Sequence, residues 1–308
     1  MNNRTLFSQS ALPGLAVGDA LGTTVEFRER DTFPEHTEMT GGGAFAVKPG
    51  EWTDDTAMAL CLGQSLVECQ GFNPKDLLAR YQDWFHHGYM ACQGQCIDIG
   101  NATRQALARY AKTGCDYAGS DNPFSSGNGA IMRLAPAVVA ASDRATAIDY
   151  AVNSSRTTHA SADCLDGAEL MAAVLWELGQ GADLKEVLDQ LPDTEERGMA
   201  IGRIKRGDFR TASRNNIASS GYVIDTLEAA LWSCYHAENF EQALITAVNL
   251  GDDADTVGAV TGQIAGAAWG VESIPARWLD KLAWRDRITN LSLMPRAISN
   301  LQKRNLKS

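Results

Sequence analysis

The sequence predicts an all-α fold built as one compact domain of packed helices. Apolar residues recur three and four positions apart through most of the 308 residues, the periodicity of a helix with one buried face. Alternating runs of Val, Ile and Thr, which are typical of half-buried strands, are nearly absent. No composition shift or long linker divides the chain, so we expect a single domain over residues 1–308, with its core at about 8–290 and a short basic C-terminal tail.

The expected helices follow one another through short, often glycine-rich connections. The third has clear start signals, because Asn73 can cap it and Pro74 suits a first helical position. In the first, Gly14, Gly18 and Gly22 recur every four residues, which indicates tight packing against another helix. The predicted helices cover residues 8–21, 56–67, 74–85, 99–110, 131–141, 145–153, 160–178, 183–191, 223–235, 240–249 and 256–269.

Charge and composition exclude several classes of function. The net charge is −11 and the pI is near 4.9, which disfavours nucleic acid and anionic membranes as partners. The N-terminus lacks a basic region followed by a long apolar run, so a secretion signal is not expected. The seven cysteines lack zinc-binding spacing, and free thiols in a reducing compartment are expected. These observations predict a cytoplasmic protein that does not bind membranes, and the lack of an obvious sticky helix favours a monomer.

Two acidic clusters lie far apart in the sequence, each at the start of a buried helix of small residues. They are Thr53-Asp54-Asp55 and the segment from Asp252 to Thr256. Helix capping is one interpretation, but a cap needs one side chain and the clusters supply five carboxylates and two hydroxyls. So many anions in an apolar neighbourhood are costly without counterions. Because Mg²⁺ and Mn²⁺ prefer oxygen ligands, the clusters predict a divalent metal site.

Two familiar acidic motifs do not fit these clusters. In an EF-hand counted from Asp253, the twelfth position would need Glu, and it is Ile264. The DDxxD pattern of helical isoprenoid synthases fails as well. Asp54-Asp55 has Met58 where the third Asp should stand, and Asp252-Asp253 reaches Asp255 too soon. The metal site is therefore of another kind.

Seven short motifs, taken together and in order, resemble the ADP-ribosylglycohydrolase family. The resemblance extends from Gly14 to Trp269, nearly the whole chain, and looks closest to the bacterial branch of the dinitrogenase reductase-activating glycohydrolase, which removes ADP-ribose from arginine. Each motif alone is weak, whereas seven in register are specific. The motifs are Gly18–Gly22 with the following Glu26, Trp52–Thr56, Asp98–Asn101, Ser126–Gly129, Thr158-His159, Gly221-Tyr222 and Gly251–Thr256.

The resemblance implies an all-α fold with two Mg²⁺ or Mn²⁺ ions in a cleft at helix ends and loops. Asp252 precedes the matching pair and is expected to support or cap rather than to bind metal. The expected metal ligands are Thr53, Asp54, Asp55, Asp253, Asp255 and Thr256. The expected catalytic residues are Glu26, Asp54, Asp55, Asp98, Asp253 and Asp255. The expected substrate-binding residues are Gly100, Asn101, Ser126, Gly127, Asn128, Gly129, His159 and Tyr222.

Some of these roles stay open at the level of the residues. Gly127 and Gly129 suit a phosphate-binding loop through close backbone approach, positive φ and free N–H groups of a following helix, but a plain helix-start turn has the same pattern. His159 taken alone is more often an ordinary core or surface histidine, and it gains a binding role only through the resemblance. Glu26 and Asp98 are candidates for proton transfer or substrate orientation, with no assignment between them.

The implied activity is hydrolysis of the N-glycosidic bond between ADP-ribose and a modified protein side chain, with arginine as the first expectation. Such a bond breaks through an oxocarbenium-like state, and two ions can orient ribose hydroxyls and activate water. The substrate would be an ADP-ribosylated protein and the product ADP-ribose. Two alternatives are open: another ADP-ribose linkage (serine, nucleic acid or small molecule), or a catalytically silent ADP-ribose-binding protein. The complete set of expected ligands favours activity.

Overall fold

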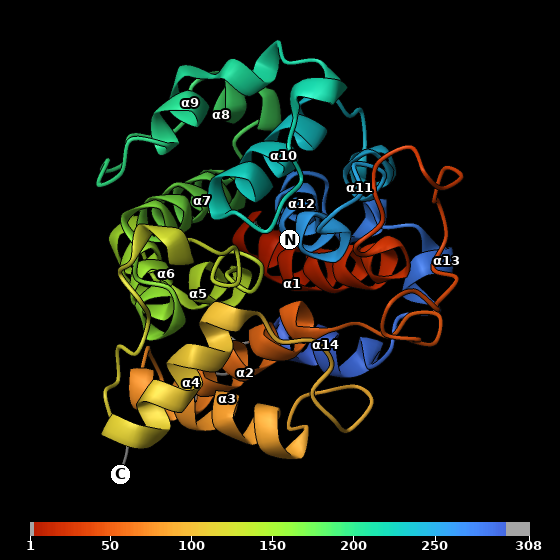
Figure 1. Ribbon diagram of the computed structural model, residues 1–308. Helices are drawn as coiled ribbons and strands as arrows, with labels where there is room; N and C mark the ends of the chain where they lie inside the picture. The colour runs from red at the N-terminus through yellow and green to blue at the C-terminus, as the bar shows by residue number, and fades with distance from the viewer. Residues whose placement is uncertain (1–2, 294–308) are drawn as a thin grey trace.

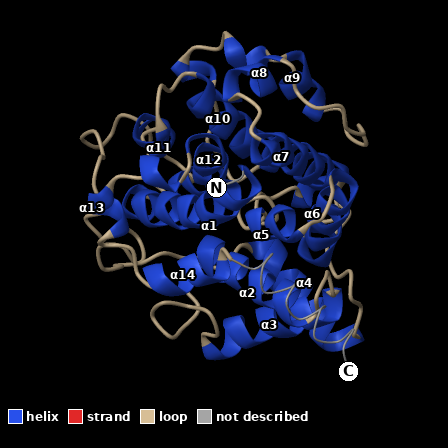
Figure 2. Ribbon diagram, turned by 180° about the vertical axis from the view of Figure 1, so that it is seen from behind, coloured by secondary structure: helices blue, strands red, loops and turns tan. Residues whose placement is uncertain are grey.

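A computed structural model describes residues 3–293 and confirms the all-α class. Within those residues the backbone forms helices and loops, with isolated bridges in place of any strand (Figure 2). The α-helices are α1 (Asn3–Gly22), α2 (Asp54–Glu68), α3 (Pro74–His87), α4 (Asn101–Thr113), α5 (Ala135–Ala140), α6 (Arg144–Thr158), α7 (Ala162–Gln180), α8 (Leu184–Asp189), α9 (Ile201–Arg206), α10 (Val223–Tyr235), α11 (Phe240–Val248), α12 (Ala254–Trp269), α13 (Ala276–Leu279) and α14 (Arg285–Leu291). Short 3-10 helices are η1 (Thr23–Val25), η2 (Pro123–Ser125), η3 (Asp208–Arg210), η4 (Arg214–Asn216) and η5 (Val271–Ser273).

The antiparallel pair α1 and α12 forms the centre of the molecule (Figure 1). The pair meets backbone to backbone, as the glycine spacing in α1 predicts. A Cβ added at Gly18 would lie 2.0 Å from the carbonyl oxygen of Gly258, and one at Gly14 would lie 2.2 Å from that of Gly262. Gly22 faces Ala254 in the same way. This packing places the end of α1 against the start of α12.

The other helices surround the central pair. On one side lie α2, α3 and α4, and on the other lie α10 and α11, an arrangement seen from both directions in Figures 1 and 2. α2, α5 and α7 contact α1, while α10 and α11 contact α12. The start of α2 meets the end of α1, because the carboxylate of Asp19 accepts hydrogen bonds from the backbone N–H groups of Thr53 and Thr56. Three helix ends therefore converge at one place.

The predicted helix over residues 131–141 is wrong in its first turn, since α5 begins only at Ala135. The cause is a side chain from α12. The amide of Gln263 donates to the carbonyls of Ile131 and Met132 and accepts from the N–H of Ala135. In a continuous helix the Ile131 carbonyl would bond the Ala135 N–H. Gln263 takes both groups, so the preceding residues form turns instead.

Two expectations from composition are consistent with the described chain. All seven cysteines are free. None of the helices in residues 3–293 combines the length and apolarity needed to cross a bilayer. The basic tail with Lys303, Arg304 and Lys307 lies outside the described residues.

The glycine contacts between α1 and α12 generate a stability prediction. We expect Gly18→Ala to lower the free energy of unfolding by about 3 kcal/mol, because its Cβ overlaps the Gly258 carbonyl and the two helices must separate. The measurement is urea unfolding followed by circular dichroism. Gly202→Ala in α9 is the matched control. Among the described residues its Cβ would meet the end of Arg206 alone, at 3.5 Å, and the change there should stay within about 1 kcal/mol. Equal stabilities of the two variants would contradict the prediction.

Candidate active site

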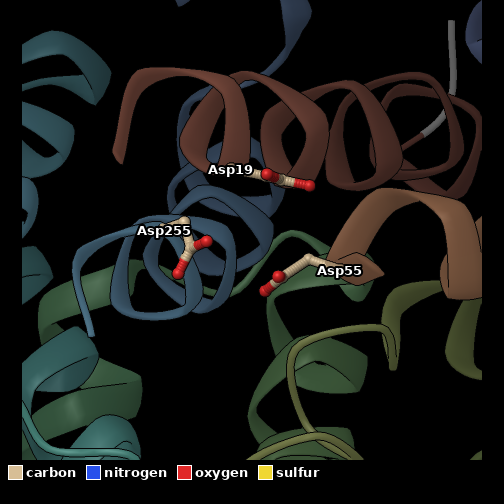
Figure 3. Close-up of side chains that lie close together, drawn as sticks. All are labelled: Asp19, Asp55 and Asp255. Carbon is tan, nitrogen blue, oxygen red and sulfur yellow. The ribbon is translucent and has the colours of Figure 1, made fainter. Parts of the chain in front are cut away.

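Three carboxylates from three helices meet where α1, α2 and α12 converge. They belong to Asp19, Asp55 and Asp255, and Figure 3 shows the side chains approaching one another from the three ribbons. One oxygen from each lies within 4.8 Å of the others. The residues are 0%, 1% and 2% exposed. Both oxygens of Asp55 are buried without a hydrogen-bond partner among the described residues, which is costly for a carboxylate unless a cation occupies the space beside it.

A second carboxylate group shares Asp255 with the first. One oxygen each from Glu26, Asp253 and Asp255 lies within 4.8 Å of the others. Glu26 is fixed because its Oε2 accepts the backbone N–H of Asp255 at 3.1 Å. The amide of Asn128 donates to Asp253 Oδ2 at 3.0 Å. The two acidic groups are thus joined through Asp255, and each could hold a metal ion.

The electrostatics of these groups fit divalent cations. Burial is the main cause that raises the pKa of Asp54, Asp55, Asp255 and Glu26, and neighbouring carboxylates raise these pKa values further. Oxygen-rich, anionic sites of this kind are what Mg²⁺ and Mn²⁺ prefer. The two Asp55 oxygens that lack a hydrogen-bond partner among the described residues could coordinate such an ion.

Asp19 is a site residue that the sequence analysis missed. Its two oxygens accept hydrogen bonds from the N–H and the hydroxyl of Thr53 and from the N–H and the hydroxyl of Thr56. Asp19 therefore caps α2 from another helix, and Thr53, at the N-cap position, makes no side-chain cap of its own. An available signal was the charge of Asp19 within the otherwise small and apolar Gly18–Gly22 motif.

Beside the carboxylates opens a cleft of about 770 Å³. All eight predicted substrate-binding residues line it, and so do Glu26, Asp54, Asp98, Asp253 and Thr256. Thr53, Asp55 and Asp255 are buried and do not line it. Asp54 and Thr256 face the cleft but belong to neither carboxylate group.

The glycine-rich loop differs from its predicted form. Gly127 and Gly129 do not have positive φ, and no helix directly follows them, since α5 starts at Ala135. Close packing explains Gly129 instead, because a Cβ there would lie 2.7 Å from Cε1 of His159. The loop is held by backbone hydrogen bonds to the segment before α10, from Asn128 N–H to the Gly221 carbonyl and from Val223 N–H to the Ser126 carbonyl.

Three other predicted residues occupy distinct positions at the cleft. Tyr222 is half-buried, and its hydroxyl donates to Asp163 at 2.6 Å, which fixes the ring at the cleft wall. Asp98 has left-handed backbone with φ 57°, and its carboxylate accepts the N–H of Ile99. Burial raises the pKa of Asp98. Asn101 is the exposed first residue of α4.

Asp252 lies outside both carboxylate groups and is exposed. It does not cap α12, since Asp253 occupies the N-cap position. Its backbone instead pairs with the segment after Glu26, accepting from the Phe27 N–H and donating to the Arg28 carbonyl, both at 2.8 Å. Asp252 thus supports the loop that carries Glu26 through its backbone, and the expected capping of α12 is not seen.

Comparison with known proteins places this geometry in a family. The model of the family described as ADP-ribosylglycohydrolase matches residues 8–305. This chain belongs to the ADP-ribosylglycohydrolase family. The expectation from the seven motifs is confirmed at the level of the family.

Named relatives of the family cover most of the chain. The sequence is 41% identical over 287 residues to "ADP-ribosylarginine hydrolase Tri1" of Serratia proteamaculans, covering 92% of this chain and 77% of that protein. It is 34% identical to "ADP-ribosyl-[dinitrogen reductase] glycohydrolase" of Rhodospirillum rubrum, with 88% of each chain covered. A solved "ADP-ribosylglycohydrolase-related protein complex" contains a chain with 42% identity and a TM-score of 0.84, covering 96% of this chain and 99% of that one.

The carboxylates of this ADP-ribosylglycohydrolase predict an unusual pH dependence of the metal-free protein. The pKa values of Asp54, Asp55 and Asp255 are raised on folding, so the folded state holds more protons than the unfolded chain. Their contribution to stability is full below about pH 4, the unfolded Asp pKa, and is lost as pH rises through the folded-state pKa values. In the presence of a chelator, we expect the melting temperature to rise as the pH is lowered from about 8 to about 5.

Two further measurements isolate this effect. Saturating Mn²⁺ should weaken or reverse the trend, because metal binds the deprotonated carboxylates. An Asp55→Asn and Asp255→Asn double variant should show a smaller pH dependence than the wild type, since the other titratable groups remain. A double variant with the wild-type slope would refute the assignment.

The contacts of Asp19 predict an effect on metal binding. We expect Asp19→Asn to weaken Mn²⁺ binding about 10–100-fold, because an amide cannot accept all the hydrogen bonds that hold Thr53 and Thr56 at the start of α2. The measurement is calorimetric titration with Mn²⁺. Asp166→Asn serves as the control, since Asp166 is equally buried but pairs with Arg197. Unchanged Mn²⁺ affinity in Asp19→Asn would show that the cap does not position the ligands.

Proposed function

We propose that this protein is a divalent-metal-dependent hydrolase that releases ADP-ribose from arginine side chains of modified proteins, reversing mono-ADP-ribosylation. The observation that carries the proposal is the pair of carboxylate groups joined at Asp255, set at the edge of a cleft lined by the residues expected to bind ADP-ribose. The arginine linkage is supported by the relative whose name specifies ADP-ribosylarginine. Membership of the family supports the reaction type.

The proposed metal ligands are Thr53, Asp54, Asp55, Asp253, Asp255 and Thr256, holding two Mg²⁺ or Mn²⁺ ions. Such ions supply Lewis acidity for the ribose hydroxyls and lower the pKa of a water molecule. The protein's own contribution is to hold these oxygens rigidly. Asp255 is fixed by the N–H of Thr256 at 2.7 Å, and Asp253 by Asn128. Rigid helix ends position ligands better than free loops do.

Proton transfer is assigned to Glu26 and substrate orientation to Asp98. One oxygen of Glu26 is held by the Asp255 N–H, while the residue lines the cleft beside Asp253. Burial and the neighbouring carboxylates raise the pKa of Glu26, so it can hold a proton for the departing guanidine. Asp98 lies outside both carboxylate groups and is placed on the same cleft, where it can bind ribose hydroxyls together with Asn101.

The glycine-rich loop and its neighbours are the proposed diphosphate site. Gly127 and Asn128 N–H groups donate to carbonyls within the protein. No acceptor among the described residues is hydrogen bonded to the N–H of Gly129, which lines the cleft. That N–H is free for a phosphate oxygen. The wall of the site is completed by Gly100, Ser126, His159 and Tyr222.

The remaining expectations form part of the same proposal. We propose one domain over residues 1–308, a monomeric state and a cytoplasmic location, with an ADP-ribosylated protein as substrate and ADP-ribose as product. The net charge of −11 supports a protein surface rather than nucleic acid as the carrier of the modification. The experiment below also tests the two alternatives, a different ADP-ribose linkage and binding of ADP-ribose without turnover.

The proposed function predicts metal-dependent release of ADP-ribose from an ADP-ribosylated arginine protein. We expect Asp55→Ala and Asp255→Ala each to lower the rate about 10³-fold or more, because each removes charge stabilisation worth several kcal/mol. Asp252→Asn is the matched control. It changes an exposed Asp of the same cluster that lies outside both carboxylate groups, and it should retain activity.

The measurement is chromatographic detection of free ADP-ribose with Mg²⁺, with Mn²⁺ and with chelator. Release from arginine that both alanine variants abolish supports the hydrolase. Release only from serine or nucleic-acid conjugates would replace the arginine linkage. Tight ADP-ribose binding without any release would contradict the enzymatic proposal.

A further inference from the structure

A fully buried arginine lies behind the glycine-rich loop. Arg133 is 0% exposed, and no carboxylate in the described chain lies within ion-pair distance of it. Its guanidinium donates to the carbonyl of Gly129, to the hydroxyl of Thr158 at 2.7 Å and to the carbonyl of Ser154 at 3.4 Å. It also lies over the ring of Tyr81 at 4.9 Å from the centroid. Burying a cation without a counterion costs free energy, which suggests that Arg133 has a specific role at this position.

The hydroxyl of Thr158 connects this arginine to His159. Thr158 Oγ1 lies 2.7 Å from Arg133 Nη2 and 2.8 Å from His159 Nδ1. A guanidinium can only donate, so the hydroxyl oxygen accepts from it. No other acceptor for the Thr158 proton is present among the described residues, and buried hydroxyl protons are normally bonded. The proton therefore points to Nδ1, which must be an acceptor.

An accepting Nδ1 determines the rest of the imidazole. A neutral histidine carries one ring proton, so that proton is on Nε2. Burial and the nearby Arg133 lower the pKa of His159 to about 3, which keeps the ring neutral. The ring packs against the loop, since a Cβ at Gly127 would lie 3.4 Å from Nε2. His159 also lines the cleft.

We propose that Arg133 and Thr158 act as positioning residues that fix His159 in its Nε2–H tautomer, so that the ring donates a hydrogen bond to an oxygen of the bound ADP-ribose. The inference rests on the proposed function, since it takes the cleft to bind ADP-ribose. The opposite tautomer presents a lone pair to the same oxygen and repels it. Arg133 cannot change its donor role, so the direction of both hydrogen bonds is fixed.

The direct test is ¹⁵N NMR of histidine in the ligand-free protein, which needs no enzymatic activity. The protonated and bare ring nitrogens differ widely in ¹⁵N shift. The chain has five histidines, and the His159 signals are identified by their absence in His159→Gln. We expect the wild type and Thr158→Ser to show protonated Nε2 and bare Nδ1, and Thr158→Val to lose this single tautomer. Protonated Nδ1 in the wild type, or an unchanged tautomer in Thr158→Val, overturns the proposal.

Binding of ADP-ribose tests the consequence. Thr158→Val should weaken binding about fivefold, the effect of one neutral hydrogen bond, while Thr158→Ser stays near wild type. In a His159→Gln background, Thr158→Val should have no further effect, because there is no tautomer left to select. Equal losses in both backgrounds would mean a purely structural role for Thr158 and overturn the proposal.

Arg133→Lys and Arg133→Met complete the series, provided that they fold. Lys keeps a charge but loses the planar fork, and both variants should reduce the preference for Nε2–H. The Thr158 variants decide the proposal if neither folds. The protein could fail to hydrolyse any conjugate while the tautomer and the binding of ADP-ribose change as expected. That result would refute the proposed function and support the role of Arg133 and Thr158 in fixing the His159 tautomer.

Discussion

The close contact between α1 and α12 is the constraint on which the site depends. Only glycines on both helices allow the backbones to meet, as at Gly18 and Gly258. The antiparallel crossing then puts the end of α1 beside the start of α12, so Asp19 and Asp255 lie together. Asp19 in turn holds the first turn of α2 through Thr53 and Thr56. Packing of small residues in the core thus determines where charges gather.

The same packing makes the site depend on a ligand for its electrostatic balance. Carboxylates placed on rigid helix ends cannot turn toward water to escape one another, so burial and repulsion raise the pKa values of Asp55 and Asp255. A flexible loop with the same residues would relax instead. The helices therefore keep the ligand oxygens together at a cost that a bound cation offsets. Asp55, which has no hydrogen-bond partner among the described residues, occupies a position that an aspartate without a cation would avoid.

The sequence predicts those parts of the molecule that local patterns determine. Helical periodicity locates α10 with its observed bounds, Val223–Tyr235, and the start signals Asn73 and Pro74 locate the start of α3. It fails where a distant side chain intervenes, as Gln263 does in the turn before α5. The short helices α9, α13 and α14 are absent from the prediction, although the equally short α8 lies within the helix predicted over residues 183–191. Asp19 was missed for a related reason: only the tertiary contact with α2 shows what its carboxylate does.

The glycine-rich loop lies at the cleft, as predicted, but with a backbone conformation that differs from the predicted one. Gly127 and Gly129 do line the cleft, yet they serve the packing of His159 rather than positive φ. Behind the loop, Arg133 supplies a buried positive charge that pairs with no carboxylate of the described residues, while the carboxylate groups beside the cleft could hold cations. Under the proposed function, a chain of net charge −11 binds an anionic ligand because its positive charge is local: one part is fixed in the core, and the other arrives with the metal.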